Sequence, residues 1–238
     1  MLRDTVRAVR IRLALAVPLG VFVLLTGCGG TPDPVPTDGG SGGADLQEET
    51  HGDPDMPRPP DDHGPVLLES HTRPKYSVTN VPKSPDVTGN LKVPLKREWN
   101  YIVVHHSFTR AGSEASFDRY HRNVRGWLGV GYHFVIGNGH GSPDGKVEVT
   151  FRWEKQLHGA HAGVDKYNQH GIGICLVGNF EKGYPSQKQM GSLAALVNYL
   201  QSRCHIPTKN ILLHRHVKST KCPGENFPFY QFISMLEH

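Results

Sequence analysis

The chain has 238 residues, of which 26 are basic and 22 are acidic, and its length allows one ordinary domain with extensions. The net charge of +4 conceals two regions of opposite sign: residues 29–95 carry 5 basic and 11 acidic residues, a net of −6, and residues 96–238 carry 17 and 10, a net of +7. The excess in the second region is too modest to identify a partner alone, but it excludes a strongly acidic or strongly basic domain.

The N-terminal residues 1–27 have the order of a secretory signal peptide: four arginines, then the apolar run Leu13–Leu25. This run is shorter than the roughly 20 residues that a membrane-spanning helix needs. It ends in Leu25-Thr26-Gly27-Cys28, which resembles the lipobox of bacterial lipoproteins. We therefore expect lipid on the Cys28 thiol, with a plain signal peptide or a single membrane anchor as the alternative.

Residues 28–94 are predicted to be a flexible, acidic linker. They are rich in Gly and Pro and bury too little apolar surface to fold, although the composition leaves the position of residues 66–95 open. A tether of this length reaches roughly 45 Å from the membrane. Gly29 stands where Asp can retain lipoproteins at an inner membrane, so we expect the cell envelope and, where there are two membranes, the outer one, facing the periplasm.

The remaining residues, 95–238, are predicted to form a single domain. Tyr101–Val104 is a continuous β-branched run typical of a strand buried on both faces. Glu114–Asn123 indicates a short helix. Val130–Ile136 and Lys146–Phe151 predict two strands of a hairpin around a Gly-rich turn.

The second half of this domain continues the alternation of strands and helices. Gly171–Val177 and Ile211–Leu213 predict further buried strands. Ser186, with Gln189 three residues later, forms a capping box before a long helix, and Phe227–Leu236 is predicted to be the closing helix. The fold class is therefore α/β, with a mixed central β-sheet flanked by helices.

Three of the potential metal ligands follow predicted strands or a turn. His105 follows the first strand, His214 follows Ile211–Leu213, and Cys222 lies in a loop eight residues later. Two imidazoles and a thiolate are suitable Zn²⁺ ligands, and three protein ligands leave a fourth position open for catalysis. By spacing alone, His106 and His216 are equally available.

Four motifs make the prediction more specific. In chain order they are Val104-His105-His106-Ser107, Val130-Gly131-Tyr132-His133-Phe134, Gly171 to Gly178, and His214 to Cys222-Pro223-Gly224. They resemble the motifs of the type-2 N-acetylmuramoyl-L-alanine amidases, which include phage amidases and catalytic peptidoglycan recognition proteins. The resemblance covers the whole domain and implies zinc on His105, His214 and Cys222, and not on His106.

The resemblance also implies a reaction: hydrolysis of the amide between the lactyl group of N-acetylmuramic acid and L-alanine. It assigns Tyr132 and Thr220 to catalysis, where their hydroxyls orient water or bind the oxyanion, and it places His161 and Asn168 in a substrate-facing loop. Some relatives carry Lys at the Thr220 position. A branch that cleaves anhydromuropeptides carries Glu at the Cys175 position and lacks the tyrosine, so this chain resembles the other branch.

The expected partners are peptidoglycan or muropeptides and, through Cys28, a membrane; nucleic acid is not expected in an exported protein, and we expect a monomer. A peptidoglycan-binding module without activity is one alternative, although such proteins typically lack the ligand at Cys222. An anhydromuropeptide-recycling amidase and a lipid-anchored structural protein are others. Cys175 and Cys204 remain open as a disulfide or as two free thiols.

Overall fold

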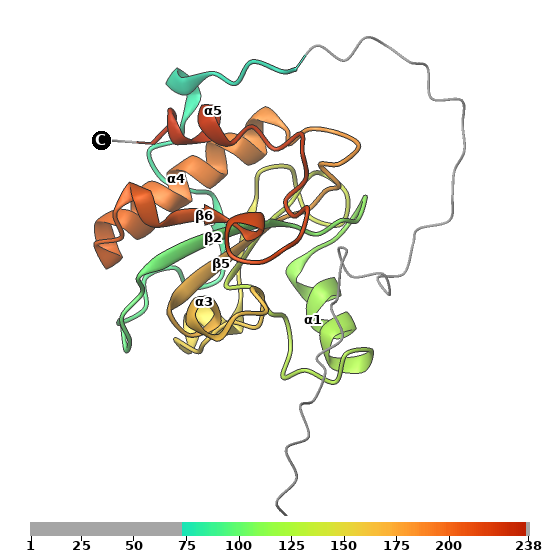
Figure 1. Ribbon diagram of the computed structural model, residues 1–238, viewed down its shortest axis with the longest axis vertical. Helices are drawn as coiled ribbons and strands as arrows, with labels where there is room; N and C mark the ends of the chain where they lie inside the picture. The colour runs from blue at the N-terminus through green and yellow to red at the C-terminus, as the bar shows by residue number, and fades with distance from the viewer. Residues whose placement is uncertain (1–72, 237–238) are drawn as a thin grey trace, which may run out of the picture. The chain divides into compact units, whose positions relative to one another are not determined.

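The computed structural model describes residues 73–236 (Figure 1). The predicted signal peptide, the lipid acceptor Cys28 and residues 28–72 of the predicted linker lie outside these residues. Between residues 73 and 236, no helix combines the length and the apolar character needed to cross a membrane.

The centre of the domain is a mixed six-stranded sheet in the order β1-β4-β3-β5-β2-β6. All neighbouring strands run parallel except β3 and β4, which form the predicted hairpin. This arrangement confirms the predicted mixed α/β fold. The strands are β1 (Val87–Thr88), β2 (Tyr101–His106), β3 (Phe134–Ile136), β4 (Val147–Val149), β5 (Gly171–Leu176) and β6 (Ile211–Leu213).

Helices flank the sheet. Figure 1 shows α4 and α5 close together and α1 at a distance from them. The helices are α1 (Glu114–Asn123), α2 (Phe151–Glu154), α3 (Asp165–His170), α4 (Gln187–Cys204) and α5 (Phe229–Ile233), with short 3₁₀ turns η1 (Val78–Asn80), η2 (Thr208–Asn210) and η3 (His214–His216). The range of α1 agrees with the prediction from sequence.

The strand residues alternate between two apolar clusters on opposite faces of the sheet. Ile102 and Val104 of β2 belong to the larger cluster, together with the buried faces of α4 and α5. Cys175 of β5 and Val177 just after it belong to a smaller cluster that α1 covers. Since His105 follows Val104 in an extended strand, its side chain points to the face with the smaller cluster.

The predicted capping box of α4 is present. The Ser186 side chain accepts a hydrogen bond from Gln189 N, and the Gln189 side chain accepts one from Ser186 N. Gln189 is also buried, and its Nε2 donates to the carbonyl oxygens of Ile136 and Val177 at the ends of β3 and β5. The cap therefore fixes the start of α4 to the sheet.

Two strands differ in length from the prediction. β2 extends through His106, so that His105 lies within the strand. The strand predicted at Val130–Ile136 begins only at Phe134. The reason is that Val130 N donates to Asp118 Oδ1 and Gly131 N to His121 Nδ1, so side chains of α1 replace a neighbouring strand as hydrogen-bond partners.

The end of β4 and the start of α5 also differ from the prediction, and both elements are shorter than predicted. β4 stops at Val149 because the Thr150 side chain accepts from Arg152 N and caps α2. The closing helix, predicted from Phe227, begins only at Phe229. Phe227 itself is buried in the larger cluster and its N–H bonds to the Gly224 carbonyl in the preceding turn, so it lies outside the helix.

Residues 73–94, whose position the composition left open, pack against the domain. Val87 and Thr88 form the edge strand β1 beside β4. Leu91 and Val93 are buried in the larger cluster, and the Trp153 indole N–H donates to the Leu91 carbonyl. The folded region therefore begins before residue 95, the predicted start of the domain.

Candidate metal centre

The sheet register brings His105 and His214 together. Val104 of β2 pairs with Leu213 of the parallel strand β6. The residue after each of these two is a histidine, and the two imidazole centroids are 4.5 Å apart. Two adjacent parallel strands thus deliver two potential ligands at the same edge of the sheet.

Cys222 reaches the same place from the loop after η3. The Arg215 N–H donates to the Cys222 carbonyl at 2.9 Å, and the Arg215 guanidinium donates to the Gly224 carbonyl at 2.8 Å, which closes the loop. Gly224 has φ +103°, and a Cβ there would lie 2.3 Å from the backbone of Phe180. Glycine therefore allows the loop to approach the chain after β5 closely.

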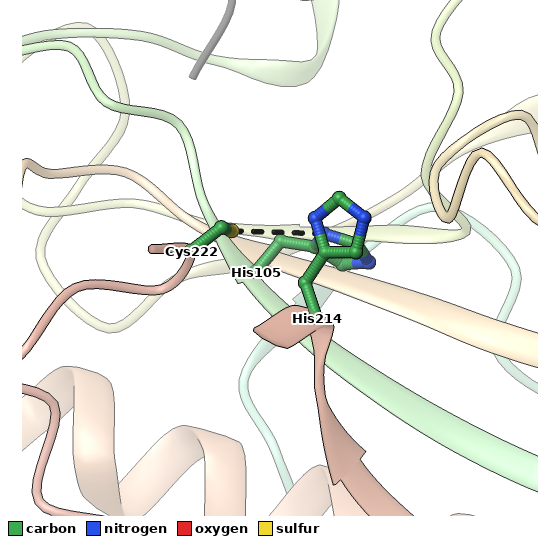
Figure 2. Close-up of side chains that lie close together, drawn as sticks. All are labelled: His105, His214 and Cys222. Atoms are coloured by element: carbon green, nitrogen blue, oxygen red, sulfur yellow. Dashed lines mark hydrogen bonds between the residues drawn. The ribbon is translucent and has the colours of Figure 1, made fainter. Parts of the chain in front are cut away.

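The three side chains converge on one point (Figure 2). The Sγ of Cys222 lies 3.8 Å from Nδ1 of His105, and the ligand atoms of His105, His214 and Cys222 all lie within 4.8 Å of one another. Nitrogen and sulfur ligands of one tetrahedral zinc ion are about 3.6 Å apart, given bond lengths of about 2.0 and 2.3 Å. The donor set and its spacing therefore fit a zinc ion.

Each histidine of this group also uses its second ring nitrogen. Nε2 of His214 lies 3.1 Å from the Ala162 carbonyl oxygen, and Nε2 of His105 lies 3.0 Å from Nδ1 of His161. Such outer contacts orient histidine ligands and leave the other nitrogen for the metal. In both residues, Nδ1 is the nitrogen left over.

The two alternative histidines have other partners. His106 Nδ1 accepts a hydrogen bond from Phe180 N at 3.2 Å, and His216 Nδ1 accepts one from Leu213 N at 3.3 Å. Within residues 73–236, the only cluster of potential ligands that includes a cysteine and two histidines is the one formed by His105, His214 and Cys222.

Burial sets the protonation of the three groups. It lowers the pKa of His105 well below its usual value, helped by the nearby His214, and it lowers the pKa of His214 to about 4. Burial raises the pKa of the Cys222 thiol to about 12 in the absence of a metal, against the opposing effect of the His106 N–H. The imidazoles are thus neutral at pH 7, and the thiol must release a proton when it binds a cation.

The cluster lies in the wall of a cavity of about 290 Å³. The other four residues predicted to act in catalysis or substrate binding, Tyr132, Thr220, His161 and Asn168, line the same cavity. The sequence thus predicted residues from four separate segments that the fold brings to one place. Their roles stay predictions.

Tyr132 and Thr220 lie beside the metal ligands. The Tyr132 ring centroid is 5.3 Å from that of His105, and Tyr132 packs against the smaller cluster, which contains the buried Cys175. Thr220 Oγ1 accepts a hydrogen bond from Cys222 N at 3.3 Å. Because a hydroxyl both accepts and donates, Thr220 keeps its own hydrogen for another acceptor.

The structure places Asn168 in α3 and not in the predicted loop, and His161 lies in the loop before this helix. Asn168 Oδ1 accepts from the backbone N–H groups of His161 and Ala162, both at 2.9 Å, so its side chain holds the loop shape. The His161 side chain is largely buried and contacts His105. Cys175, Cys204 and Cys222 are free thiols, so the structure contains no bond between Cys175 and Cys204.

Arg152 is a residue of the site region that the sequence did not reveal. It is 2% exposed, and its guanidinium donates to the Val130 carbonyl at 2.5 Å and to the His158 carbonyl at 2.6 Å. These carbonyls belong to the segments that carry Tyr132 and His161. Burial lowers the pKa of this guanidinium. An arginine near the end of a predicted strand gave no signal of this role.

The cavity wall contains further residues that were not predicted, among them the basic residues Arg125 and Lys218. The Trp127 ring contacts His121, at a centroid distance of 4.8 Å, and the Arg125 guanidinium, which lies over the ring at 5.6 Å. These residues add aromatic and positively charged groups to the lining of the cavity.

The fold and the site define an α/β domain with a candidate His₂Cys metal centre. Residues 95–225, more than half of the chain, match the family model described as N-acetylmuramoyl-L-alanine amidase, and the chain belongs to this family. It is 33% identical over 147 residues to peptidoglycan-recognition protein SC2 of Drosophila melanogaster, which covers 57% of this chain and 73% of that protein. It is 27% identical over 144 residues to an N-acetylmuramoyl-L-alanine amidase of Sus scrofa, covering 56% of this chain and 23% of that protein.

A solved structure shows the same fold. The endolysin N-acetylmuramoyl-L-alanine amidase LysCS from Clostridium intestinale URNW is 33% identical, with a TM-score of 0.53, and the match covers 63% of this chain and 93% of that chain. The family and these relatives support a domain that cleaves or binds peptidoglycan.

Proposed function

We propose that this protein is a zinc-dependent amidase that hydrolyses the bond between the lactyl group of N-acetylmuramic acid and L-alanine in peptidoglycan. The observation that carries the proposal is the convergence of His105, His214 and Cys222 in the wall of a cavity that Tyr132 and Thr220 also line. The names of the relatives, which include amidases from Sus scrofa and Clostridium intestinale, support it.

The three ligands suit a catalytic metal better than a structural one. Structural zinc sites have four protein ligands, whereas catalytic sites have three and an open position. Within the described residues the cluster has three members, and it faces a cavity. A zinc ion held there supplies Lewis-acid chemistry, which polarises a carbonyl oxygen and lowers the pKa of water.

The side chains around the cluster would do the remaining work. The Tyr132 hydroxyl would orient the attacking water or donate to the tetrahedral oxyanion. Thr220, whose oxygen is fixed by Cys222 N–H, would donate its hydrogen to the same oxyanion. Preorganised donors of this kind are each worth on the order of a hundredfold or more in rate.

The charge of the cavity suits a muropeptide. Arg125 and Lys218 contribute positive charge to its wall, and stem peptides carry carboxylates. We propose that the stem peptide lies toward these two residues and that the glycan-linked lactyl group lies at the metal. Asn168, which lines the same cavity, is a further candidate for substrate contact.

Metal removal and restoration test the proposal. The full chain should release peptide from purified peptidoglycan, lose this activity after chelation, and regain it when one equivalent of zinc is added. Magnesium should not restore it, because a thiolate and two imidazoles are poor ligands for that ion. Activity that persists in the chelated chain would contradict zinc dependence.

A second candidate is a peptidoglycan-binding module that does not cleave. The 33% identity to a protein named for peptidoglycan recognition favours it. In that case the chain would bind zinc and sediment with insoluble peptidoglycan, but no peptide would be released. The presence of Cys222 in the cluster argues for the amidase.

We also propose that the protein is anchored in the cell envelope by lipid on Cys28 and, where there are two membranes, in the outer one. The proposal rests on the arginine-rich start, the apolar run and the Leu25-Thr26-Gly27-Cys28 order. These residues lie outside the described part of the chain.

A further inference from the structure

His161 is in direct contact with the candidate ligand His105. It is 8% exposed, and both of its ring nitrogens have partners within the protein. Nδ1 lies 3.0 Å from Nε2 of His105, and Nε2 lies 3.2 Å from the carbonyl oxygen of Gly171. The imidazole thus links the metal cluster to the start of β5.

The Gly171 carbonyl determines where the hydrogens lie in the two hydrogen bonds that join Gly171, His161 and His105. A carbonyl oxygen only accepts, so Nε2 of His161 carries the hydrogen. In the neutral imidazole, Nδ1 of His161 is then an acceptor, and Nε2 of His105 must donate to it. His105 is left with a bare lone pair on Nδ1, the atom that lies 3.8 Å from Cys222 Sγ.

The backbone around His161 is shaped to the ring. A Cβ on Gly159 would lie 2.3 Å from His161 Cδ2, and a Cβ on Gly173 would lie 2.5 Å from the same atom. Real Cβ atoms do not approach this closely. Two glycines from different segments therefore form a slot that only this ring position fits.

From these contacts we propose that His161 is a positioning residue, which fixes the tautomer and ring orientation of His105 so that Nδ1 is ready to bind zinc. The proposal rests on the metal site of the proposed function. It assigns His161 a role that acts through the ligand His105, whereas the family resemblance predicts a contact with the substrate. The Gly171 carbonyl oxygen can only accept a hydrogen bond. It therefore fixes the tautomer of His161, and His161 in turn fixes the tautomer of His105.

Two substitutions of His161 test the two ring nitrogens one at a time. Asn places its amide oxygen near the position of Nδ1, and Gln places its amide near Nε2. His161→Asn therefore keeps the acceptor for His105, whereas His161→Gln keeps only the contact with Gly171. We expect His161→Gln to weaken zinc binding by about 10- to 100-fold and His161→Asn by less than about fivefold, as for other outer contacts of histidine ligands.

Zinc affinity of the full chain is measured by competition with a chelator, and melting temperature is recorded for each variant. Long-range ¹H–¹⁵N NMR of the zinc-free chain reports the tautomer of His105 directly. The native chain and His161→Asn should show the hydrogen on Nε2, and His161→Gln should show a mixture. A purely structural role of His161 would not change this ratio.

A third variant leaves every polar atom in place. Gly173→Ala intrudes on the ring of His161 and should weaken zinc binding, whereas Gly183→Ala is the matched control because the nearest atom to its new Cβ is 4.0 Å away. This pair decides the question if His161→Gln does not fold.

Native zinc affinity in His161→Gln, or equal losses in His161→Asn and His161→Gln with both folded, would overturn the proposal. If the native chain binds no zinc at all, the proposed function fails instead. The tautomer of His105 in the zinc-free chain would still support or refute the role of His161.

Discussion

The backbone N–H of His106 donates a hydrogen bond to Sγ of Cys222 over 3.4 Å. The residue next to one candidate ligand thus contacts another ligand through its main chain, while its side chain bonds elsewhere. This hydrogen bond lowers the pKa of Cys222 and opposes the effect of burial. It also joins the end of β2 to the loop after η3, so the two halves of the metal cluster are held together without a metal.

From this contact we expect substitutions of His105 and of His106 to have very different effects on zinc binding. His105→Ala, His214→Ala and Cys222→Ala should each lose most of the bound zinc. His106→Ala should retain about one zinc per chain, because the main-chain N–H to Cys222 is unchanged. Metal content after dialysis measures this. Loss of zinc in His106→Ala with retention in His105→Ala would reverse the ligand assignment.

Tyr132→Phe should leave zinc content and melting temperature close to those of the native chain, because the ring still packs near His105. Peptide release should fall at least about tenfold, mostly in kcat, since the lost hydrogen bond would exist mainly in the transition state. The measurement is steady-state kinetics on soluble muropeptides.

Cys175→Ala is the matched comparison for Tyr132→Phe. Cys175 is fully buried in the smaller cluster, against which Tyr132 packs. Removing the sulfur leaves a small cavity, so stability should fall more than turnover. If Cys175→Ala reduces kcat more than Tyr132→Phe does, the catalytic role belongs to position 175.

The buried histidines predict how stability depends on pH in the metal-free chain. Burial lowers the pKa of both His106 and His161 to about 3. The unfolded chain, with histidine pKa values near 6.5, binds more protons between these limits, so their stabilisation is complete above about pH 6.5 and is lost as pH falls toward 3. Each contributes a loss of about 2 kcal/mol between pH 6.5 and 5.

Urea denaturation at pH 7 and pH 5 measures this effect. His161→Asn should show a shallower dependence than the native chain, because one titrating group is removed. Equal free energies of unfolding at the two pH values in the native chain would show that these histidines are accessible to protons in the folded state.

Much of the site followed from sequence because its residues lie at strand ends. Adjacent parallel strands end at the same edge, so His105 and His214 were identifiable from two apolar runs. The contact between His161 and the second ring nitrogen of His105 was not identifiable from sequence, because the two residues are 56 positions apart and only the fold brings them together. Likewise, β1 has two residues and α3 six, which is too short for a periodic pattern.

The lipid anchor is tested outside the folded domain. Cys28→Ser should abolish labelling with a radioactive or alkyne fatty acid and move the protein from the membrane to the soluble fraction. The signal peptide is otherwise unchanged in this variant, so export should continue. Labelling that persists in Cys28→Ser would contradict the anchor.

Mass spectrometry of peptidoglycan digested with the native chain in H₂¹⁸O shows directly which bond the protein hydrolyses. Hydrolysis of the lactyl–alanine amide adds one oxygen from water to the lactyl carboxylate and leaves the amine on alanine. We expect free stem peptides that begin with unlabelled L-alanine and glycan chains that carry one ¹⁸O on each freed lactyl group. Zinc-loaded protein that binds the polymer but leaves it uncut, or label on any other bond, would contradict this expectation.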